Sequence, residues 1–343
     1  MNNNELFNGY TLFAPNHSKS TFIIDNYGMV VKEWISDYVP RLSVYLLSNG
    51  NLLRSAAIES NESNAAGGFE LFSWDNTLLW RYYYGPQHHD IEPLPNGNVL
   101  LLVNDFRSYS EAIDSGRDPN KLLSNNLKSL SILEIAQTGE ESGIVVWEWH
   151  AWDHIIQDYN EDKSNFGIVE QHPELIDINY APNMFSDWLH TNSLAYNDDI
   201  NQIMVSNRNT NEIWIIDHST TIAEAADHQG GDSGKGGDLL FRWGNPVAYS
   251  QGSMNDQILF GQHNAHWVED DSTNQRIMIF NNGIDRPGLD YSEILEISSP
   301  LLTNYNYGQT DQGLYGPVDI MYSYVSNDSS MFLSQDMVLP ASS

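Results

Sequence analysis

The amino-acid sequence predicts an all-β fold, a β-propeller. Apolar residues occur in short alternating runs rich in Tyr, Trp, Ile and Val, separated by turn signals such as NG, DN and NNG, a pattern typical of half-buried strands. The runs group into four-stranded units that repeat at about 45 residues or more, as propeller blades do. A sandwich or a solenoid would also use short strands, but its units would not end so regularly in an aromatic fourth strand.

The units follow one another along most of the chain. A full unit has an entering strand, a returning strand and two further strands, of which the fourth is aromatic. The units span residues 10–34, 42–84, 89–149, 189–243 and 263–324, and their last strands carry Trp34, Trp80, Trp149 and Trp243. We therefore expect these tryptophans on the outer strand of each blade.

Three polar insertions interrupt the pattern. Arg107 to Lys128 is expected to be a loop or short helix, and Ile155 to Met184 contains Pro173 and Pro182. The segment from Gln229 to Asp238 contains GGDSGKGGD, which superficially resembles a phosphate-binding loop. It fails the pattern because position 229 is not Gly and a Gly, rather than Ser or Thr, follows the Lys. A turn is expected there.

The last residues, Met331 to Ser343, begin like another entering strand and stop where its turn should come. We therefore expect a truncated last blade. Residues 1–343 would form a single β-propeller domain that is incomplete at its C-terminus, because an all-β domain can reach this size.

Composition limits the possible partners. The chain of 343 residues has a formal net charge of −31, which argues against nucleic acid and an anionic membrane surface. The sequence contains no Cys, which excludes disulfides, thiolate zinc sites and Cys nucleophiles. It contains no apolar run of about 20 residues and no signal peptide at its start.

The stretch from Asp187 to Asn209 is the centre of the functional prediction. It predicts two antiparallel strands joined by a turn at residues 197–199. His190 and Asn192 open the first strand and Arg208 closes the second. The hairpin should therefore bring an imidazole, a carboxamide and a guanidinium to the same end.

Two other segments have the same arrangement. His88 and His89 precede a strand that turns at Asn96-Gly97, and His263 and His266 open a strand that turns at residues 270–274. In a propeller, the entering strand of each blade lines the central channel, so His89, His190 and His263 should meet at one mouth of it. His88 and His266 remain ambiguous because alternation turns neighbours to opposite faces. His150, His154, His172, His218 and His228 are expected to be structural.

A group of imidazoles suggests either a metal or an anion as ligand. Histidine is a common metal ligand, but Arg208 at the same mouth would repel a cation, and no carboxylate accompanies every His. Arginine binds tetrahedral oxyanions through paired donors, and the imidazoles and Asn192 could add further hydrogen bonds. The set suits an anionic group better, and no metal and no cofactor are expected.

The motifs HHD with LPNGN, DWxHxN with SxR, and QHxA with FNNG occur here in this order, and together with the opening GYTLFAP and SVYLLSNGNLLR they resemble the bacterial arylsulfotransferase family. The resemblance covers nearly the whole chain. It implies a six-bladed propeller that transfers a sulfuryl group from a small-molecule aryl sulfate to a phenolic acceptor through a sulfohistidine. It also implies a periplasmic or extracellular location.

The resemblance assigns residues by motif. It implies that His263 carries the sulfuryl group, while His89 (or His88), His190 and Arg208 complete the catalytic set and Asn192 contacts the substrate. A neutral imidazole can attack sulfur and expel a phenolate, while Arg208, His190 and Asn192 stabilise the developing charge. His88 and His266 are further candidates for substrate binding.

Two alternative functions stay open from the sequence. The propeller could bind an aromatic or sulfated ligand, or a partner protein, without catalysis, or it could be a metal-dependent hydrolase. The natural donor and acceptor and the oligomeric state are not encoded in a pattern that can be read directly.

Overall fold

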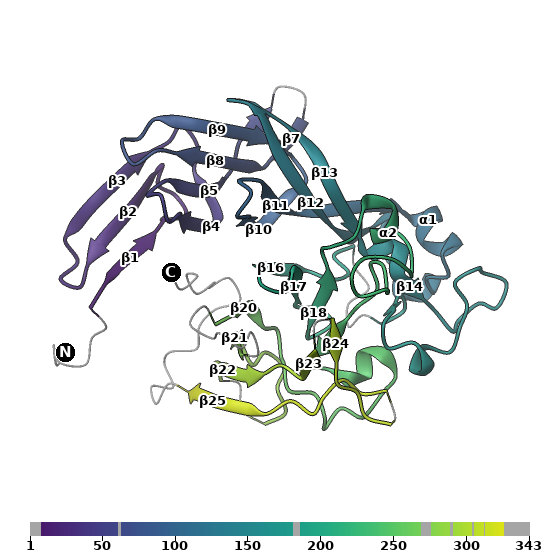
Figure 1. Ribbon diagram of the computed structural model, residues 1–343. Coiled ribbons are helices and arrows are strands. Elements are labelled where there is room, and N and C mark those ends of the chain that lie inside the picture. Colours follow the sequence, from purple (N-terminus) through teal and green to yellow (C-terminus); the bar gives the residue numbers. More distant parts are fainter. Residues whose placement is uncertain are drawn as a thin grey trace. The chain divides into compact units, whose positions relative to one another are not determined.

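The computed structural model describes residues 8–60, 63–180, 186–268, 276–288, 291–303, 305–311 and 313–325. Its secondary structure is almost entirely β, as the sequence predicts (Figure 1). The described residues form five blade sheets, which confirms the β-propeller class but not the six blades of the implied architecture. The expected truncated blade at Met331 to Ser343 lies outside the described residues.

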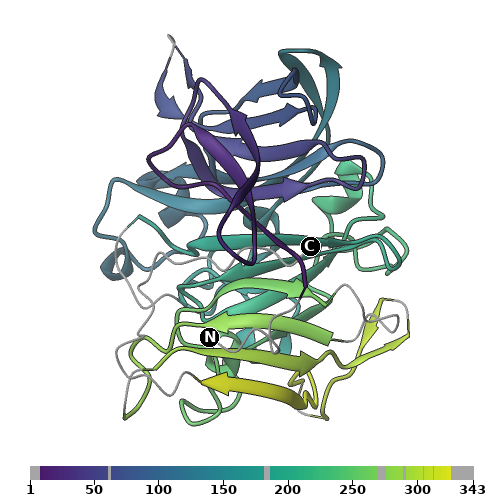
Figure 2. The same ribbon diagram turned by 90° about the vertical axis from the view of Figure 1, so that its left-hand side faces the viewer.

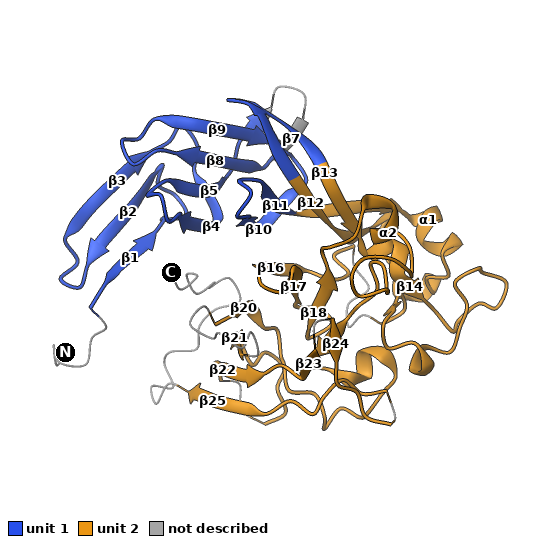
Figure 3. Ribbon diagram, in the orientation of Figure 1, with its two compact units in different colours: residues 1–101, 135–145, 339–343 blue, residues 102–134, 146–338 orange. Residues whose placement is uncertain are grey.

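The chain divides into two compact units (Figure 3). Unit 1 comprises residues 1–101, 135–145 and 339–343, and unit 2 comprises residues 102–134 and 146–338. The boundary passes through the strands of the third sheet. The expectation of one domain over residues 1–343 stays a prediction, and each unit is described by itself.

Unit 1 holds the first two blade sheets. The first has the order β1 (Tyr10–Phe13), β2 (Ser20–Asp25) and β3 (Val30–Ile35). The second has the order β4 (Pro40–Leu46), β5 (Leu52–Ala56), β8 (Gly68–Phe72) and β9 (Leu78–Tyr83), and β6 (Glu59–Ser60) pairs with β7 (Ser63–Ala66) beside it in sequence. Ile23, Trp34, Leu52 and Phe72 pack together in the core between them.

The third sheet has the order β10 (Gln87–Pro93), β11 (Val99–Ser108), β12 (Asn126–Gly139) and β13 (Ser142–His150). The first insertion contains α1 (Tyr109–Asp114) and η1 (Pro119–Lys121), as expected for a loop or short helix. Ser108 and Glu111 form a reciprocal capping box that fixes the start of α1.

Unit 2 holds the fourth and fifth sheets. The fourth has the order β16 (Thr191–Asn197), β17 (Gln202–Asn207), β18 (Glu212–Asp217) and β19 (Phe241–Trp243). The fifth has the order β20 (His263–Trp267), β21 (Arg276–Asn281), β22 (Glu293–Ser298) and β25 (Ile320–Val325). Figure 2 shows the fifth sheet in green to yellow as adjacent antiparallel strands. Apolar side chains of both sheets, among them Met204, Ile215, Ile277 and Leu295, form one buried cluster.

Shorter elements complete unit 2. They are η2 (Ala151–His154), β14 (Ile155–Ile156), η3 (Val169–Gln171), β15 (Ile176–Asp177), α2 (Ile222–Ala225), η4 (Pro246–Tyr249), β23 (Leu301–Thr303) and β24 (Asn306–Tyr307). No helix in the described part of the chain is both long and apolar enough to cross a membrane.

The four tryptophans lie on outer strands, as the repeat predicts. Trp34, Trp80, Trp149 and Trp243 lie on β3, β9, β13 and β19 and are at most 9% exposed. Three of the indoles donate to a backbone carbonyl of a segment that follows in sequence: Trp34 to Ser73 at 2.9 Å, Trp80 to Ser142 at 3.1 Å and Trp149 to Gly237 at 2.7 Å. The aromatic fourth strand therefore has a polar role as well as an apolar one.

Candidate functional site

The β16–β17 hairpin brings His190 and Arg208 together, as the sequence predicts. The two strands pair antiparallel from Thr191 with Asn207 to Asn197 with Gln202. Beyond the last pair, the backbone N–H of Arg208 donates to the carbonyl oxygen of His190 at 3.2 Å. The two residues are therefore neighbours across the open end of the hairpin.

His190 is oriented by a carboxylate. Its Nδ1 lies 2.6 Å from Oδ2 of Asp187, and both side chains are partly accessible, at 28% and 39%. His190 has a φ of +50°, a left-handed backbone that directs its side chain away from the strand's regular alternation. Because Asp187 accepts the hydrogen bond, Nδ1 carries a proton, and Nε2 is the nitrogen that can exchange protons with another group.

His263 begins β20 and is buried, with 2% of its surface exposed. Its Nδ1 lies 3.0 Å from the carbonyl oxygen of Gly261 and 2.9 Å from Nδ2 of Asn282, which itself donates to Gly261 at 2.7 Å. The carbonyl of Gly261 can only accept and favours a proton on Nδ1, whereas the amide nitrogen of Asn282 can only donate and favours a lone pair there. In the tautomer with the proton on Nδ1, the lone pair is on Nε2. The ring centroid of His263 is 6.4 Å from that of His190.

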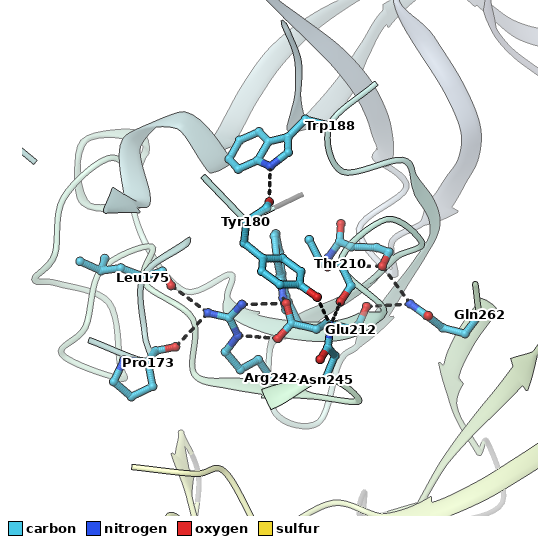
Figure 4. A network of polar contacts seen from close by, with 11 residues as sticks. Pro173, Leu175, Tyr180, Trp188, Thr210, Glu212, Arg242, Asn245 and Gln262 are labelled. Carbon is cyan, nitrogen blue, oxygen red and sulfur yellow. Dashed lines mark hydrogen bonds and ion pairs between the residues drawn. The ribbon is translucent and has the colours of Figure 1, made fainter. Parts of the chain in front are cut away.

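A buried polar network holds the residue before His263 (Figure 4). Nε2 of Gln262 donates to the carbonyl oxygens of Glu212 and Asn207 at 2.9 and 3.1 Å, and it lies 3.2 Å from Oγ of Ser206. Gln262 itself is 0% exposed. The start of β20 is therefore attached to β17 and β18 of the fourth sheet, which fixes where His263 stands.

Glu212 anchors this network through Arg242 on β19. Nε and Nη2 of Arg242 each lie 2.7 Å from one carboxylate oxygen of Glu212, and the two side chains are 1% and 0% exposed. Nη1 donates to the carbonyl of Leu175 at 2.8 Å, and the guanidinium lies 4.4 Å from the ring centroid of Tyr249. Although burial opposes the charge, the attraction of Glu212 and its hydrogen bonds raise the pKa of Arg242.

Asn192 has a structural contact that the sequence did not reveal. Its Nδ2 donates to the carbonyl oxygen of Gln262 at 2.9 Å, so it joins β16 to β20 directly beside His263. Its Oδ1 is buried and has no hydrogen-bond partner among the described residues. This oxygen can accept a hydrogen bond from a ligand or from a water molecule. The amide nitrogen already donates to Gln262.

Arg208 and His266 are the remaining predicted site residues of unit 2. Nη1 of Arg208 donates to Oδ1 of Asn209 at 3.0 Å, and the side chain is partly buried. Nδ1 of His266 lies 3.1 Å from the carbonyl of Asn264, and its buried Nε2 has no partner among the described residues. Burial lowers the pKa of His266, so this ring is neutral near pH 7.

His88 and His89 contact each other in unit 1. Their Nδ1 atoms are 2.9 Å apart and their rings are perpendicular. The expectation that strand alternation turns them to opposite faces is wrong, because His89 has a φ of +47° and the alternation breaks there. Their expected approach to His190 and His263 stays a prediction, since those residues belong to unit 2.

A left-handed residue recurs at the start of three inner strands. His89, His190 and Asn264 have φ values of +47°, +50° and +52°. If the left-handed residues are aligned, Asn264 is equivalent to His89 and His190. His263 is then equivalent to His88, and both of these histidines follow a glutamine. The predicted alignment of three histidines is therefore shifted by one residue in β20, because counting from the turn cannot detect the irregular pairing between His263 and His266.

The five histidines expected to be structural have partners. His150 lies 2.6 Å from Oγ of Ser131, His172 lies 2.9 Å from Glu174, and His218 lies between Asn201 and Glu134 at 2.9 and 3.0 Å. His154 and His228 differ because they share one carboxylate, that of Asp238.

The sequence did not reveal some residues whose hydrogen bonds position His263. The Glu212–Arg242 pair and Gln262 were not singled out, although a Glu in a third strand and an Arg beside the fourth-strand Trp occur twice, as Glu70 with Arg81 and as Glu212 with Arg242. This repeated Glu–Arg pairing is the signal that could have revealed them.

The chain matches one protein family. The family described as Arylsulfotransferase (ASST) matches residues 2–293. No curated protein shows a significant match. Among solved structures, Kuenenia stuttgartiensis hydrazine synthase is 12% identical with a TM-score of 0.42, over 79% of this chain and 64% of that chain, so this chain spans less than two thirds of it. The β-propeller domain of Myceliophteria thermophila Cps50 (Swd1) is 10% identical with a TM-score of 0.44, over 93% and 72%.

Proposed function

The chain belongs to the arylsulfotransferase family, and on this premise we propose that it transfers a sulfuryl group from an aryl sulfate to a phenol through a sulfohistidine at His263. The family supports aryl sulfotransferase activity in general. The observation that carries the finer proposal is the pairing of His190 and His263, which bring two imidazoles from adjacent blades to a centroid distance of 6.4 Å.

His263 is the proposed nucleophile. With a proton on Nδ1 shared with the carbonyl of Gly261, the lone pair is on Nε2, and a neutral imidazole nitrogen is the form that attacks. In the first half-reaction, the Nε2–S bond forms and the S–O bond to the aryl group breaks. The phenolate leaves with the bonding electrons and accepts a proton, and the sulfuryl group remains on His263.

His190 is the proposed proton donor and acceptor. Asp187, at 2.6 Å from Nδ1, holds the ring and a proton on Nδ1. In the imidazolium form Nε2 carries a proton as well, and it can give this proton to the departing aryl oxygen. In the second half-reaction, the same nitrogen takes the proton from the phenolic acceptor. The acceptor oxygen then attacks sulfur, the N–S bond breaks and His263 is regenerated.

Arg208 and Asn192 are proposed to contact the sulfuryl oxygens, together with His89 or His88 and His266. The support is strongest for Arg208, whose backbone is bonded to that of His190 and whose guanidinium matches an oxyanion in geometry and charge. The support for Asn192 is weaker, because its amide nitrogen donates to Gln262. We propose no cofactor for this reaction.

The proposed partners and location follow from the family. An aryl sulfate donor and a phenolic acceptor are its substrates, and we propose a periplasmic or extracellular location for this chain. A single propeller domain over residues 1–343 is proposed on the same basis.

The test is a comparison of wild type with His263→Asn, using a chromogenic aryl sulfate as donor and a phenol as acceptor. We expect the variant to lose about 10³-fold or more of kcat, since loss of a nucleophile removes the covalent route. Mass spectrometry of wild type mixed with donor alone should find one sulfuryl group on His263. Unchanged turnover in the variant, or an adduct on another histidine, would contradict the assignment. Donor binding without turnover in wild type would favour the non-catalytic alternative.

A further inference from the structure

A second group of ligating side chains lies in unit 2, outside the residues assigned to sulfuryl transfer. Nδ1 of His154 and Nδ1 of His228 each lie 2.8 Å from the same oxygen, Oδ1 of Asp238. The three potential ligand atoms all lie within 4.8 Å of one another. Two imidazole nitrogens and one carboxylate oxygen thus point at a single small volume.

His154 is held in a tautomer that does not suit its neighbour. Its Nε2 lies 2.9 Å from the carbonyl oxygen of Ala225, and this acceptor requires a proton on Nε2. In a neutral ring, Nδ1 then carries a lone pair directed at the carboxylate of Asp238, a contact that either a second proton on the ring or a bound cation makes favourable. Because His154 is 0% exposed, water cannot relieve this repulsion easily.

The contacts around His154 are those of a metal ligand. An imidazole that binds a metal through one nitrogen usually donates its other N–H to a backbone carbonyl or a carboxylate, which fixes the ring. The carbonyl of Ala225 has this role here. The ring also stacks on Trp149, at 5.5 Å between centroids and 6° between planes, and the indole of Trp149 donates to Gly237 at 2.7 Å.

The glycine-rich segment explains how the three groups meet. The sequence GGDSGKGGD connects His228 to Asp238, and its chain folds back so that Gly236 N–H bonds to Gly230 at 2.9 Å and Gly237 N–H to Asp227 at 3.0 Å. A Cβ on Gly237 would lie 2.1 Å from the carbonyl of Ala225 and 2.6 Å from Nε2 of His154. Glycine is therefore required for this close approach to His154, and the turn expected from the sequence has a specific use.

We propose that His154, His228 and Asp238 bind a divalent transition-metal ion, with Zn²⁺ as the best match. Nitrogen donors with one carboxylate suit Zn²⁺, whereas Ca²⁺ and Mg²⁺ prefer oxygen ligands alone. The ion would accept the lone pair of Nδ1 of His154 and one from Oδ1 of Asp238. It ties η2 to the glycine-rich segment and is independent of the proposed sulfuryl transfer.

The site keeps one side accessible. His228 is 56% exposed in its side chain, and it lines a cavity of about 480 Å³ together with Asp153, Ser164 and His172. Three protein ligands leave room for a fourth ligand from this cavity, such as a water molecule or a small anion.

The experiment measures zinc bound to the chain of 343 residues. Wild type, His228→Ala and His172→Ala are purified without chelator, dialysed against Zn²⁺ at low micromolar concentration, and analysed by elemental mass spectrometry and by competition with a coloured chelator. His172 is the matched control, because its side chain is 47% exposed and lines the same cavity but lies outside the triad. His228 is exposed enough that its replacement should leave folding intact, which circular dichroism checks.

We expect wild type and His172→Ala to bind about one zinc ion per chain and His228→Ala to bind it about 100-fold more weakly or worse. Co²⁺ added to the metal-free protein should give visible absorption bands in wild type that Asp238→Asn lacks. Absence of zinc binding in wild type overturns the proposal and assigns the cluster to a buried imidazolium–carboxylate pair. Equal zinc affinity in His228→Ala and wild type overturns it as well.

Discussion

Replacement of Glu212 by Gln removes one charge of the buried pair with Arg242 while keeping the shape of the side chain. Arg242 and Glu212 are 1% and 0% exposed, and two charge-assisted bonds of 2.7 Å join them. Without the carboxylate, the guanidinium of Arg242 stays buried without a counter-charge. The NH2 group of the new Gln side chain also faces an N–H group of Arg242 that the carboxylate oxygen accepted from. Breaking a buried pair by removing one partner costs about 3–5 kcal/mol of unfolding free energy.

The lower end of that range is expected for Glu212→Gln. Arg242 keeps its hydrogen bond to the carbonyl of Leu175 at 2.8 Å and its position over the ring of Tyr249 at 4.4 Å, and both contacts compensate a cation. The expected loss is therefore about 3 kcal/mol, measured by urea unfolding at pH 7 from the midpoint and slope.

The equivalent pair in unit 1 provides the control. Glu70 is also 0% exposed, but Arg81 is 18% exposed and has further carboxylates at 3.3 Å (Glu141) and 3.5 Å (Asp37). After Glu70→Gln, Arg81 keeps these partners and some water, so the expected loss is about 1–2 kcal/mol. Equal losses, or a larger loss in Glu70→Gln, would refute the reasoning that the burial of the remaining cation sets the cost.

Three further predictions concern positioning and pH. Asp187→Asn should lower kcat for an aryl sulfate by about 10²-fold through loss of His190 orientation, whereas Asp198→Asn at the other end of the hairpin should leave kcat unchanged, and steady-state kinetics decides. Gln262→Ala should cost about 1–3 kcal/mol in urea unfolding, because two buried carbonyls lose their donor, and kcat should fall with it. Burial raises the pKa of Asp177 to about 6, so the folded state binds this proton more tightly than the unfolded state. The free energy of unfolding therefore falls as the pH rises from about 4 to about 6. Asp177→Asn should therefore match wild type in urea unfolding near pH 4 and exceed it by about 1–2 kcal/mol at pH 8, and equal stability at both pH values would contradict this.

The strand pattern was predictable because it depends on local chemistry. The alternation of apolar and polar residues and the turn signals located β16 and β17 closely, and the last strands of the first four blade sheets carry Trp34, Trp80, Trp149 and Trp243 as expected. The pairing of His190 with Arg208 followed from the hairpin alone. These features need only sequence neighbours and a period of two.

The site was less predictable because it depends on backbone conformations that period two does not describe. Left-handed residues at His89, His190 and Asn264 change the direction of the side chains at the start of three inner strands. Non-glycine residues rarely adopt this conformation, so no simple pattern announces it. Alignment by counting from the turn therefore placed His263 one residue from its structural equivalent.

The cluster of His154, His228 and Asp238 was missed for a related reason. His154 and Asp238 are separated by 84 residues, and each looks like a structural residue when taken alone. What joins them is the glycine-rich segment, which resembled a phosphate loop only in composition. Its glycines serve a close backbone approach to His154, a function that depends on tertiary contacts.

The polar network of unit 2 links the stability of the fourth sheet to the geometry of the candidate site. The guanidinium of Arg242 donates to the carboxylate of Glu212. The side-chain amide of Gln262 donates to the backbone carbonyl of Glu212, and the side-chain amide of Asn192 donates to the backbone carbonyl of Gln262. His263 follows Gln262 directly, so a shift anywhere in this series moves the proposed nucleophile relative to His190. Because an error of about 1 Å in such a position can cost about 10²-fold in rate, Glu212→Gln should lower kcat even at temperatures where the variant is fully folded. Normal kcat in a folded Glu212→Gln protein would show that His263 is positioned by β20 alone.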